Sequence, residues 1–213
     1  MNKKLIIIGP GIIFVSLVTY IILGPELFGK NELALEATKK DVLNEVKKTK
    51  EYADKTSKWM GENGEDTDIG FLHPPEEHKK NEDPKLDVLK YFIAGLLAKD
   101  IDIFLSSFNP ETVSKDMYQS KVEDKTKVAK EIMNRISREG QIKDVQYKIE
   151  KGAFTSGVRN KLSVTLTYKD NRSAKVKLDI IPLGDAHQHE NKESIYVITT
   201  SAWKIIEQIE KST

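Results

Sequence analysis

The sequence predicts an α+β protein in which a transmembrane helix and a helical stalk precede a bent antiparallel sheet of about four strands packed on three helices. Three patterns in the 213 residues indicate this class. The chain has an uncharged apolar run near its start. Apolar residues then recur at helical spacing between residues 84 and 140. After residue 144 they alternate with polar residues, which is the period of a β-strand.

The uncharged run comprises Leu5–Leu23. A helix of this length spans about 28 Å, close to the ~30 Å hydrocarbon core of a bilayer. A cleaved signal peptide is the alternative, because Lys3 and Lys4 form a basic start. However, the run exceeds the usual signal core, and no small-residue cleavage site follows it. We therefore expect a cytoplasmic stub at 1–4 and a retained transmembrane helix at 5–23.

The charges that flank this run predict its orientation. Lys3 and Lys4 precede it, whereas Glu26, Lys30 and Glu32 follow it with mixed charge. Because lysine and arginine are enriched on the cytoplasmic side of membrane spans, the N-terminus is expected in the cytoplasm. The rest of the chain would then lie outside it, at the cell membrane.

The composition excludes several classes of function. The 34 basic and 33 acidic side chains give a formal charge of +1, so the chain offers no electrostatic reason to bind nucleic acid. The chain has no cysteine, which excludes disulfides, thiolate chemistry and cysteine metal sites. An extracytoplasmic domain without disulfides is more typical of Gram-positive envelopes than of secreted eukaryotic proteins.

Residues 24–60 are expected to form an extracytoplasmic helical stalk. From Asn31 to Met60 the sequence is rich in Lys, Glu, Ala and Leu and lacks Gly and Pro, which favours a helix. The stalk is either solvated or paired with a second copy, because Val42, Val46 and Trp59 have no other cover in the sequence.

Residues 61–83 combine glycines, prolines and dense charge, and we expect a flexible linker there. The linker also contains His73 and His78, which we interpret as solvated. Its apolar residues Ile69, Phe71 and Leu72 are exceptions to this composition. They are expected to dock either on the neighbouring domain or on a partner.

Residues 84–213 are predicted to form one α+β domain. Asp83 and Pro84 suit the start of a helix, and apolar spacing then predicts two helices in series that bend at Lys99–Asp100 and end before Pro110. Ser120 and Glu123 have capping-box spacing for a third helix that ends at Gly140.

Alternating segments follow these helices and predict antiparallel strands with one buried and one solvated face. They lie around Val145–Glu150, Lys161–Tyr168 and Ser173–Ile180, with a turn at Lys169–Arg172. A last strand is expected at Ser194–Ile209, with a bulge or bend between Thr199 and Ala202.

The domain resembles the NTF2-like, cystatin-like superfamily, whose members bend a sheet into a cone around a long N-terminal helix. The residues that suggest this are the kinked opening helix, Leu86–Phe108, and the closing segment Ala202–Ile206. The resemblance covers about residues 84–210, and the long segment Pro182–Glu193 departs from it. The architecture of one span and an NTF2-like domain is also similar to inner-membrane assembly factors of type IV secretion and to Gram-positive conjugation proteins.

Two sets of residues are candidates for chemistry. His187, His189 and Glu190 are close enough in sequence to suggest a metal site, but they lack a recognisable third ligand and fit a solvated loop better. Asp100 and Asp102 lie where some NTF2-like enzymes place a pocket acid, yet the buried strand face offers no partner for them. We expect both aspartates to be helix caps, and we predict no catalytic, metal or cofactor site and no enzyme activity.

The sequence thus favours a scaffold or protein-interaction subunit of a bacterial envelope machine. The alternative is a small-ligand-binding or sensing module that uses the interior of the cone. Partners are expected to be the bilayer through Leu5–Leu23, and other proteins or a second copy. The solvated sheet face is a candidate contact surface for an acidic partner through its lysines, Lys148, Lys161, Lys175, Lys177 and Lys204.

Overall fold

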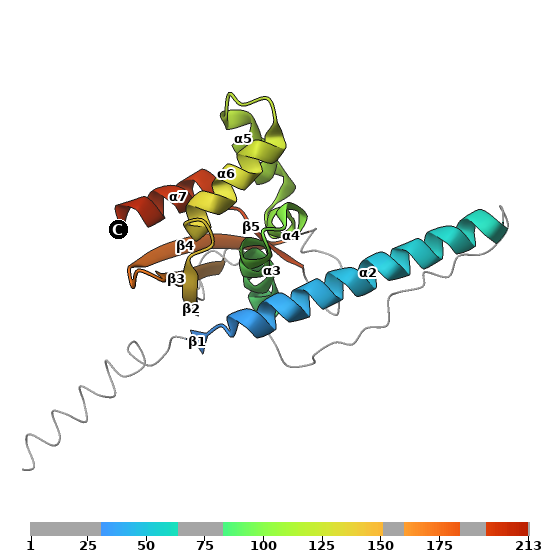
Figure 1. Ribbon diagram of the computed structural model, residues 1–213, viewed down its shortest axis with the longest axis horizontal. Helices are drawn as coiled ribbons and strands as arrows, with labels where there is room; N and C mark the ends of the chain where they lie inside the picture. The colour runs from blue at the N-terminus through green and yellow to red at the C-terminus, as the bar shows by residue number, and fades with distance from the viewer. Residues whose placement is uncertain (1–30, 64–82, 151–159, 184–194, 213) are drawn as a thin grey trace, which may run out of the picture.

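The computed structural model describes residues 31–63, 83–150, 160–183 and 195–212. Within this part of the chain, six helices and five strands form an α+β body (Figure 1). The sheet is antiparallel, with strand order β1-β2-β3-β4-β5. The strands are β1 (Asn31–Glu32), β2 (Ile142–Glu150), β3 (Asn160–Tyr168), β4 (Ser173–Pro182) and β5 (Tyr196–Ile198).

The predicted bend between two helices is confirmed. α3 (Pro84–Ala98) begins after Asp83, whose carboxylate accepts from the Lys85 amide at 3.0 Å. α4 (Ile101–Ser106) begins after Asp100, which accepts from the Ile103 amide at 3.0 Å. Lys99 adopts the left-handed region between the two helices, with φ 55°.

The helices lie over one face of the sheet, and the core fills the space between them. Alternation along β4 buries Ala174, Val176, Leu178 and Ile180 and leaves Ser173, Lys175 and Lys177 exposed. The predicted turn is confirmed: Asn171 has φ 63°, and Asp170 accepts from the Arg172 amide at 3.0 Å. The buried face therefore follows from the period of the sequence.

Several parts of the expected fold class were wrong. The expected final strand at 194–209 is the short β5 followed by a helix, α7 (Ala202–Lys211). The break expected between Thr199 and Ala202 is the point where strand gives way to helix. A helix that was not expected, α5 (Pro110–Gln119), precedes α6 (Lys125–Ser137). Asp124, and not Ser120, caps α6 by accepting from the amides of residues 126 and 127.

The helix expected between Asn31 and Met60 is found, but its first half does not stand apart from the domain as a stalk. β1 pairs with β2, and Leu33 lies in the main core, so the chain just before α2 belongs to the body. α2 (Leu35–Asn63) packs along α3, where Val42 is 2 % exposed against Ala94 and Ile103. β1 is the strand that makes the sheet five-stranded instead of four-stranded.

The fold class also contained a transmembrane helix. Among the helices in the described ranges, none is both long and apolar enough to cross a bilayer, so the described part of the chain contains no transmembrane helix. Residues 5–23, on which the expectation rested, lie outside the described ranges, as do residues 64–82 of the expected linker.

Candidate functional site: the open face of the sheet

Of the two sets of residues singled out for chemistry, only the two aspartates lie in the described part of the chain. Asp100 caps α4, as expected, and Asp102 is an exposed residue in the first turn of that helix. His187, His189 and Glu190 lie outside the described residues. Within the described ranges, no three His, Cys, Asp or Glu side chains lie close enough together to hold a metal ion.

The solvated face of β2, β3 and β4 carries polar side chains in a regular arrangement. We call it the open face. The strand register arranges its side chains in four rows that cross the three strands. In order, these rows are Asp144–Thr167–Ser173, Gln146–Thr165–Lys175, Lys148–Ser163–Lys177 and Glu150–Lys161–Asp179.

Hydroxyl groups line the middle strand of the open face, and ammonium groups flank them. Ser163 lies between Lys148 and Lys177, and Thr165 lies beside Lys175. Because neighbouring strands are about 4.8 Å apart, the two lysines beside Ser163 arise about 10 Å apart. Ser163 itself is only 7 % exposed, whereas Lys148, Lys175 and Lys177 are exposed. These three ammonium groups can donate to carboxylates or backbone carbonyls of a partner protein.

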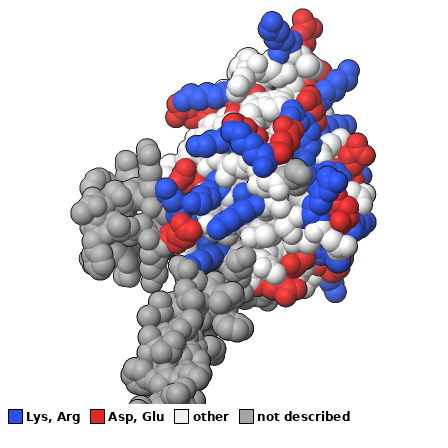
Figure 2. All heavy atoms as spheres, turned by 90° about the vertical axis from the view of Figure 1, so that its left-hand side faces the viewer, with Lys and Arg blue, Asp and Glu red and all other residues white. Residues whose placement is uncertain are grey.

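Acidic residues lie in the two outer rows, on either side of the lysines in the middle rows. Glu150 and Asp179 flank Lys161 in one outer row, and Asp144 lies in the other. Hydrogen bonds fix part of the surface: Ser163 Oγ donates to Glu150 Oε1 at 2.8 Å, and the Thr167 and Ser173 hydroxyls are 3.0 Å apart. Charges of both signs also mix on the side of the molecule shown in Figure 2. The open face therefore suits a partner with mixed charge better than a purely acidic one.

Lys204, the fifth lysine expected on this face, is not part of it. The residue lies on α7, because the expected last strand is helical there. α7 instead covers the edge of β4. The Gln208 side chain accepts from the Lys177 amide at 2.8 Å and donates to the Lys177 carbonyl at 3.3 Å, as a neighbouring strand would.

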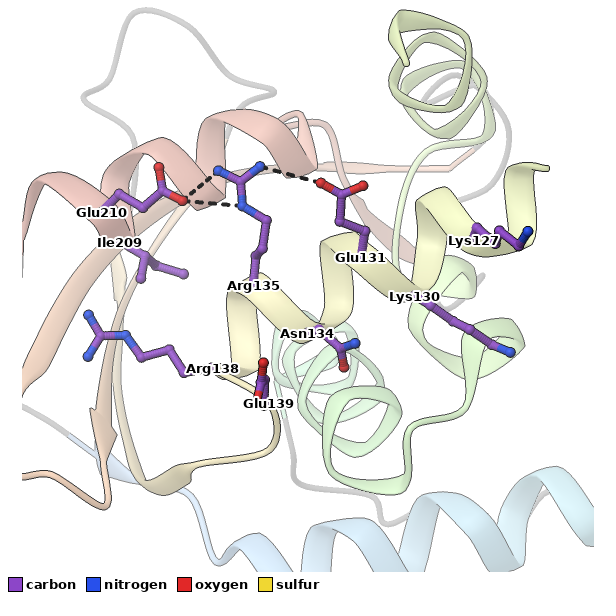
Figure 3. Close-up of a pocket in the computed structure, with 9 residues that line it drawn as sticks. All are labelled: Lys127, Lys130, Glu131, Asn134, Arg135, Arg138, Glu139, Ile209 and Glu210. Carbon is purple, nitrogen blue, oxygen red and sulfur yellow. Dashed lines mark hydrogen bonds and ion pairs between the residues drawn. The ribbon is translucent and has the colours of Figure 1, made fainter. Parts of the chain in front are cut away.

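A charged groove of about 810 Å³ lies between α6 and α7 (Figure 3). Its side chains already neutralise one another. Arg135 reaches from α6 to Glu210 on α7, with Nε 3.2 Å from the carboxylate, and lies 3.8 Å from Glu131. Its guanidinium also lies over the Trp203 ring, 5.7 Å from the centroid. Because a ligand would have to break these pairs, we interpret the groove as a helix–helix contact.

The second half of α2 is the other exposed element. We call residues 47–63 the arm. In Figure 1, α2 continues well past α3 and away from the body. From Lys47 to Asp54 every side chain is exposed except that of Tyr52, which is half-buried. The first half of the helix is fixed by Val42 and by Tyr91 of α3, whose pKa is raised by burial and by the neighbouring Glu45 carboxylate.

One structural residue was missed in the sequence, together with α5, the helix that carries it. Asp116 of α5 is 3 % exposed, and its carboxylate accepts from Ser201 Oγ at 2.6 Å and from the Ala202 amide at 2.7 Å. It thereby caps α7 from another helix. Asn109 and Pro110 were the available signal for α5, because they repeat the Asp83–Pro84 start of α3. No sequence signal identifies Asp116 itself, since its partners are more than 80 residues away.

Comparison with protein-family models, with curated proteins and with solved structures found no match to this chain.

Proposed function

We propose that this chain is a scaffold or protein-interaction subunit of a bacterial cell-envelope assembly, held at the cell membrane by its apolar run Leu5–Leu23. The form of α2 is the observation that carries this proposal. One half of the helix is fixed to the core through Val42, and the other half extends as the arm. An isolated helix gains little stability in water. The arm extends past the body and its side chains from Lys47 to Asp54 are exposed or half-buried, which favours a partner that packs on it.

The arm is long enough to contact a second protein. α2 has 29 residues, which correspond to about 43 Å of helix, and residues 47–63 contribute about 25 Å of that length. Val46 is half-buried against α3, and Ala53 and Met60 repeat its heptad position along the arm. The partner is therefore either a second copy of this chain or another helical protein.

The path of the chain suggests where the body would lie. Seven residues, 24–30, separate the apolar run from β1, and they can span at most about 25 Å. β1 is the edge strand next to β2, so the sheet edge, and not the far end of a stalk, would lie near the membrane. The arm and the open face would then be the surfaces presented to neighbouring proteins.

The alternative, a small-ligand module, requires an empty interior. The space under the helices is instead filled by Phe92, Phe104 and Phe108, whose ring centroids lie 5.1 to 5.8 Å apart. This packing favours recognition at the surface. The resemblance to NTF2-like proteins, and the architectural similarity to secretion and conjugation assembly factors, stay predictions.

Site-specific photo-crosslinking in native membranes tests the proposed function. A photoreactive amino acid is placed at Tyr52 on the arm or at Thr165 on the open face, with Lys130 on α6 as an exposed control position. We expect adducts with envelope proteins or with a second copy from the first two positions and none from the control. An absence of adducts at both positions would refute the role.

The proposed location has its own test. The chain has no cysteine, so an Ala53→Cys variant carries a single thiol on the arm. We expect a membrane-impermeant maleimide to label this thiol on intact protoplasts. Protection of the thiol until the membrane is permeabilised, or recovery of the chain in the soluble fraction, would contradict it.

A further inference from the structure

An apolar groove of about 430 Å³ lies beside β5, away from the open face and the arm. One wall comes from α4, α5 and their junction, with Leu105, Phe108 and Val113. The other wall comes from the base of the β4–β5 hairpin, with Leu183, Ile195 and Val197. Neither the fold nor the proposed function accounts for this surface.

Two residues of the groove are unusually exposed for their type. Ile195 is 67 % exposed and Leu183 is 48 % exposed, and they are two of the four large apolar side chains exposed in the described ranges. Clustered apolar side chains in a concave surface indicate a binding site more strongly than isolated ones do.

The walls are already fixed in position. The Leu183 amide donates to the Ile195 carbonyl at 2.6 Å, which closes the hairpin base. The Ile198 amide donates to the Ser107 carbonyl and the Asn109 amide donates to the Ile198 carbonyl, both at 2.8 Å, which joins the two walls. A preformed groove costs little to order on binding.

The chain enters the body beside this groove. Lys85, in the first turn of α3, has its ammonium 5.7 Å from the centroid of the Tyr196 ring. Tyr196 is the residue between Ile195 and Val197. α3 therefore begins next to the strand wall.

One segment before Asp83 has matching chemistry. Residues 64–82 lie outside the described ranges, and in sequence Ile69, Phe71 and Leu72 are the apolar residues among their glycines, prolines and charges. Leu72 precedes Asp83 by 11 residues, which reach at most about 38 Å. A segment tethered this close has an effective concentration in the millimolar range, so weak apolar contacts suffice to fill the groove.

We propose that the groove between α5 and the β4–β5 hairpin binds the segment Ile69–Leu72 of the same chain. This inference rests on the groove and on the path of the chain, and it does not depend on the proposed function.

Disulfide trapping in the full chain tests the contact. The double variant Phe71→Cys with Ser114→Cys pairs the segment with the groove rim, and Phe71→Cys with Ser173→Cys on the open face is the control. Under copper-phenanthroline oxidation we expect the first pair to form an intramolecular disulfide at least about tenfold faster than the control, at a rate independent of protein concentration. Equal rates for the two pairs would overturn the proposal, as would a disulfide-linked dimer, which indicates a second copy in the groove.

Limited proteolysis supplies an independent readout. The Ile195→Asp variant changes an exposed residue, so the body remains folded, and Tyr118→Asp is the control because Tyr118 is exposed and does not line the groove. We expect cleavage between residues 73 and 82 to be about tenfold faster in Ile195→Asp and in Phe71→Asp than in wild type, with no further gain in the double variant. Wild-type rates in both single variants, or additive gains in the double variant, would overturn the proposal.

Discussion

The two faces of the sheet are formed by the same strands, yet they serve different purposes. Along β3, Leu162, Val164 and Leu166 are at most 1 % exposed and pack under the helices. Their neighbours Lys161 and Thr165 point to the open face, where cross-strand rows of polar groups form. Under the proposed function, alternate residues of one strand would separate stability from recognition, so substitutions on the two faces should have separable effects.

Neighbouring residues of β3 offer the most direct test of this separation. We call the face of the sheet that packs under the helices the covered face. Leu166→Ala removes a buried side chain from it and is expected to lower the free energy of unfolding by about 3.5 kcal/mol. Thr165→Ala, one residue away on the open face, should lower it by less than about 1 kcal/mol. Denaturant unfolding of a fragment with residues 31–213, followed by circular dichroism, measures both. Equal losses would mean that the open face is also part of the core.

The covered face also depends on a close approach between α3 and α4. A Cβ atom at Gly95 would lie 2.5 Å from the backbone nitrogen of Phe104. Gly95→Ala should therefore destabilise the fold by about 3 kcal/mol, although the same change in a solvated helix stabilises it by about 1 kcal/mol. Gly61→Ala, near the end of α2, is the matched control. Unfolding curves that show stabilisation by Gly95→Ala would contradict the observed packing.

Much of the covered face could be predicted from the sequence because its signals are local. The Asp83–Pro84 start, the Asp100 cap and the alternation in β3 and β4 each lie within a few residues, and all are confirmed. The largest error was α7. Ala202, Ile205, Ile206 and Ile209 have helical spacing, but the alternation of Trp203 with Ile205 predicts a strand, and the helical spacing is the one that the structure follows.

The remaining errors concern long-range contacts. β1 has two residues and exists only because it pairs with β2, more than 100 positions away. The docking of α2 depends on Ala94 and Ile103 as the cover for Val42, and no local pattern identifies them. Of the candidate site, the lysines on β2, β3 and β4 were predicted, whereas their rows depend on register, which the sequence leaves open.

Tyr168 joins the covered face to α6 and makes that contact sensitive to alkali. Its hydroxyl donates to the Ile136 carbonyl at 3.0 Å, and burial raises its pKa from 10.0 to about 12, although Arg138 over its ring opposes the shift. Because the unfolded phenol ionises near pH 10 and the folded one near pH 12, its stabilisation is complete below pH 10 and is lost as the pH rises through 12. The loss is on the order of 2 to 3 kcal/mol.

The Tyr168→Phe variant measures this effect by difference. The variant lacks both the hydrogen bond and the ionisation, so wild type should be more stable by about 1 kcal/mol at pH 8. This advantage should shrink and reverse between pH 10 and pH 12, while the other tyrosines contribute equally to both proteins. A difference that stays constant up to pH 12 would show that Tyr168 does not titrate with a raised pKa.

The open face should show the smallest effect on stability and the clearest effect on binding. The double variant Lys148→Glu with Lys177→Glu reverses the two charges beside Ser163, and Lys115→Glu with Lys121→Glu reverses two exposed charges on and just after α5. Because all four lysines are exposed, each pair should change the free energy of unfolding by less than about 0.5 kcal/mol per residue.

Crosslinking from a photoreactive residue at Thr165 should fall at least about tenfold in the first pair and remain at the wild-type level in the second. If both pairs reduced crosslinking equally, the effect would depend on the net charge of the chain and not on the rows of the open face. If neither pair reduced it, the lysines beside Ser163 would have no part in recognition, and the arm alone would remain as the contact surface.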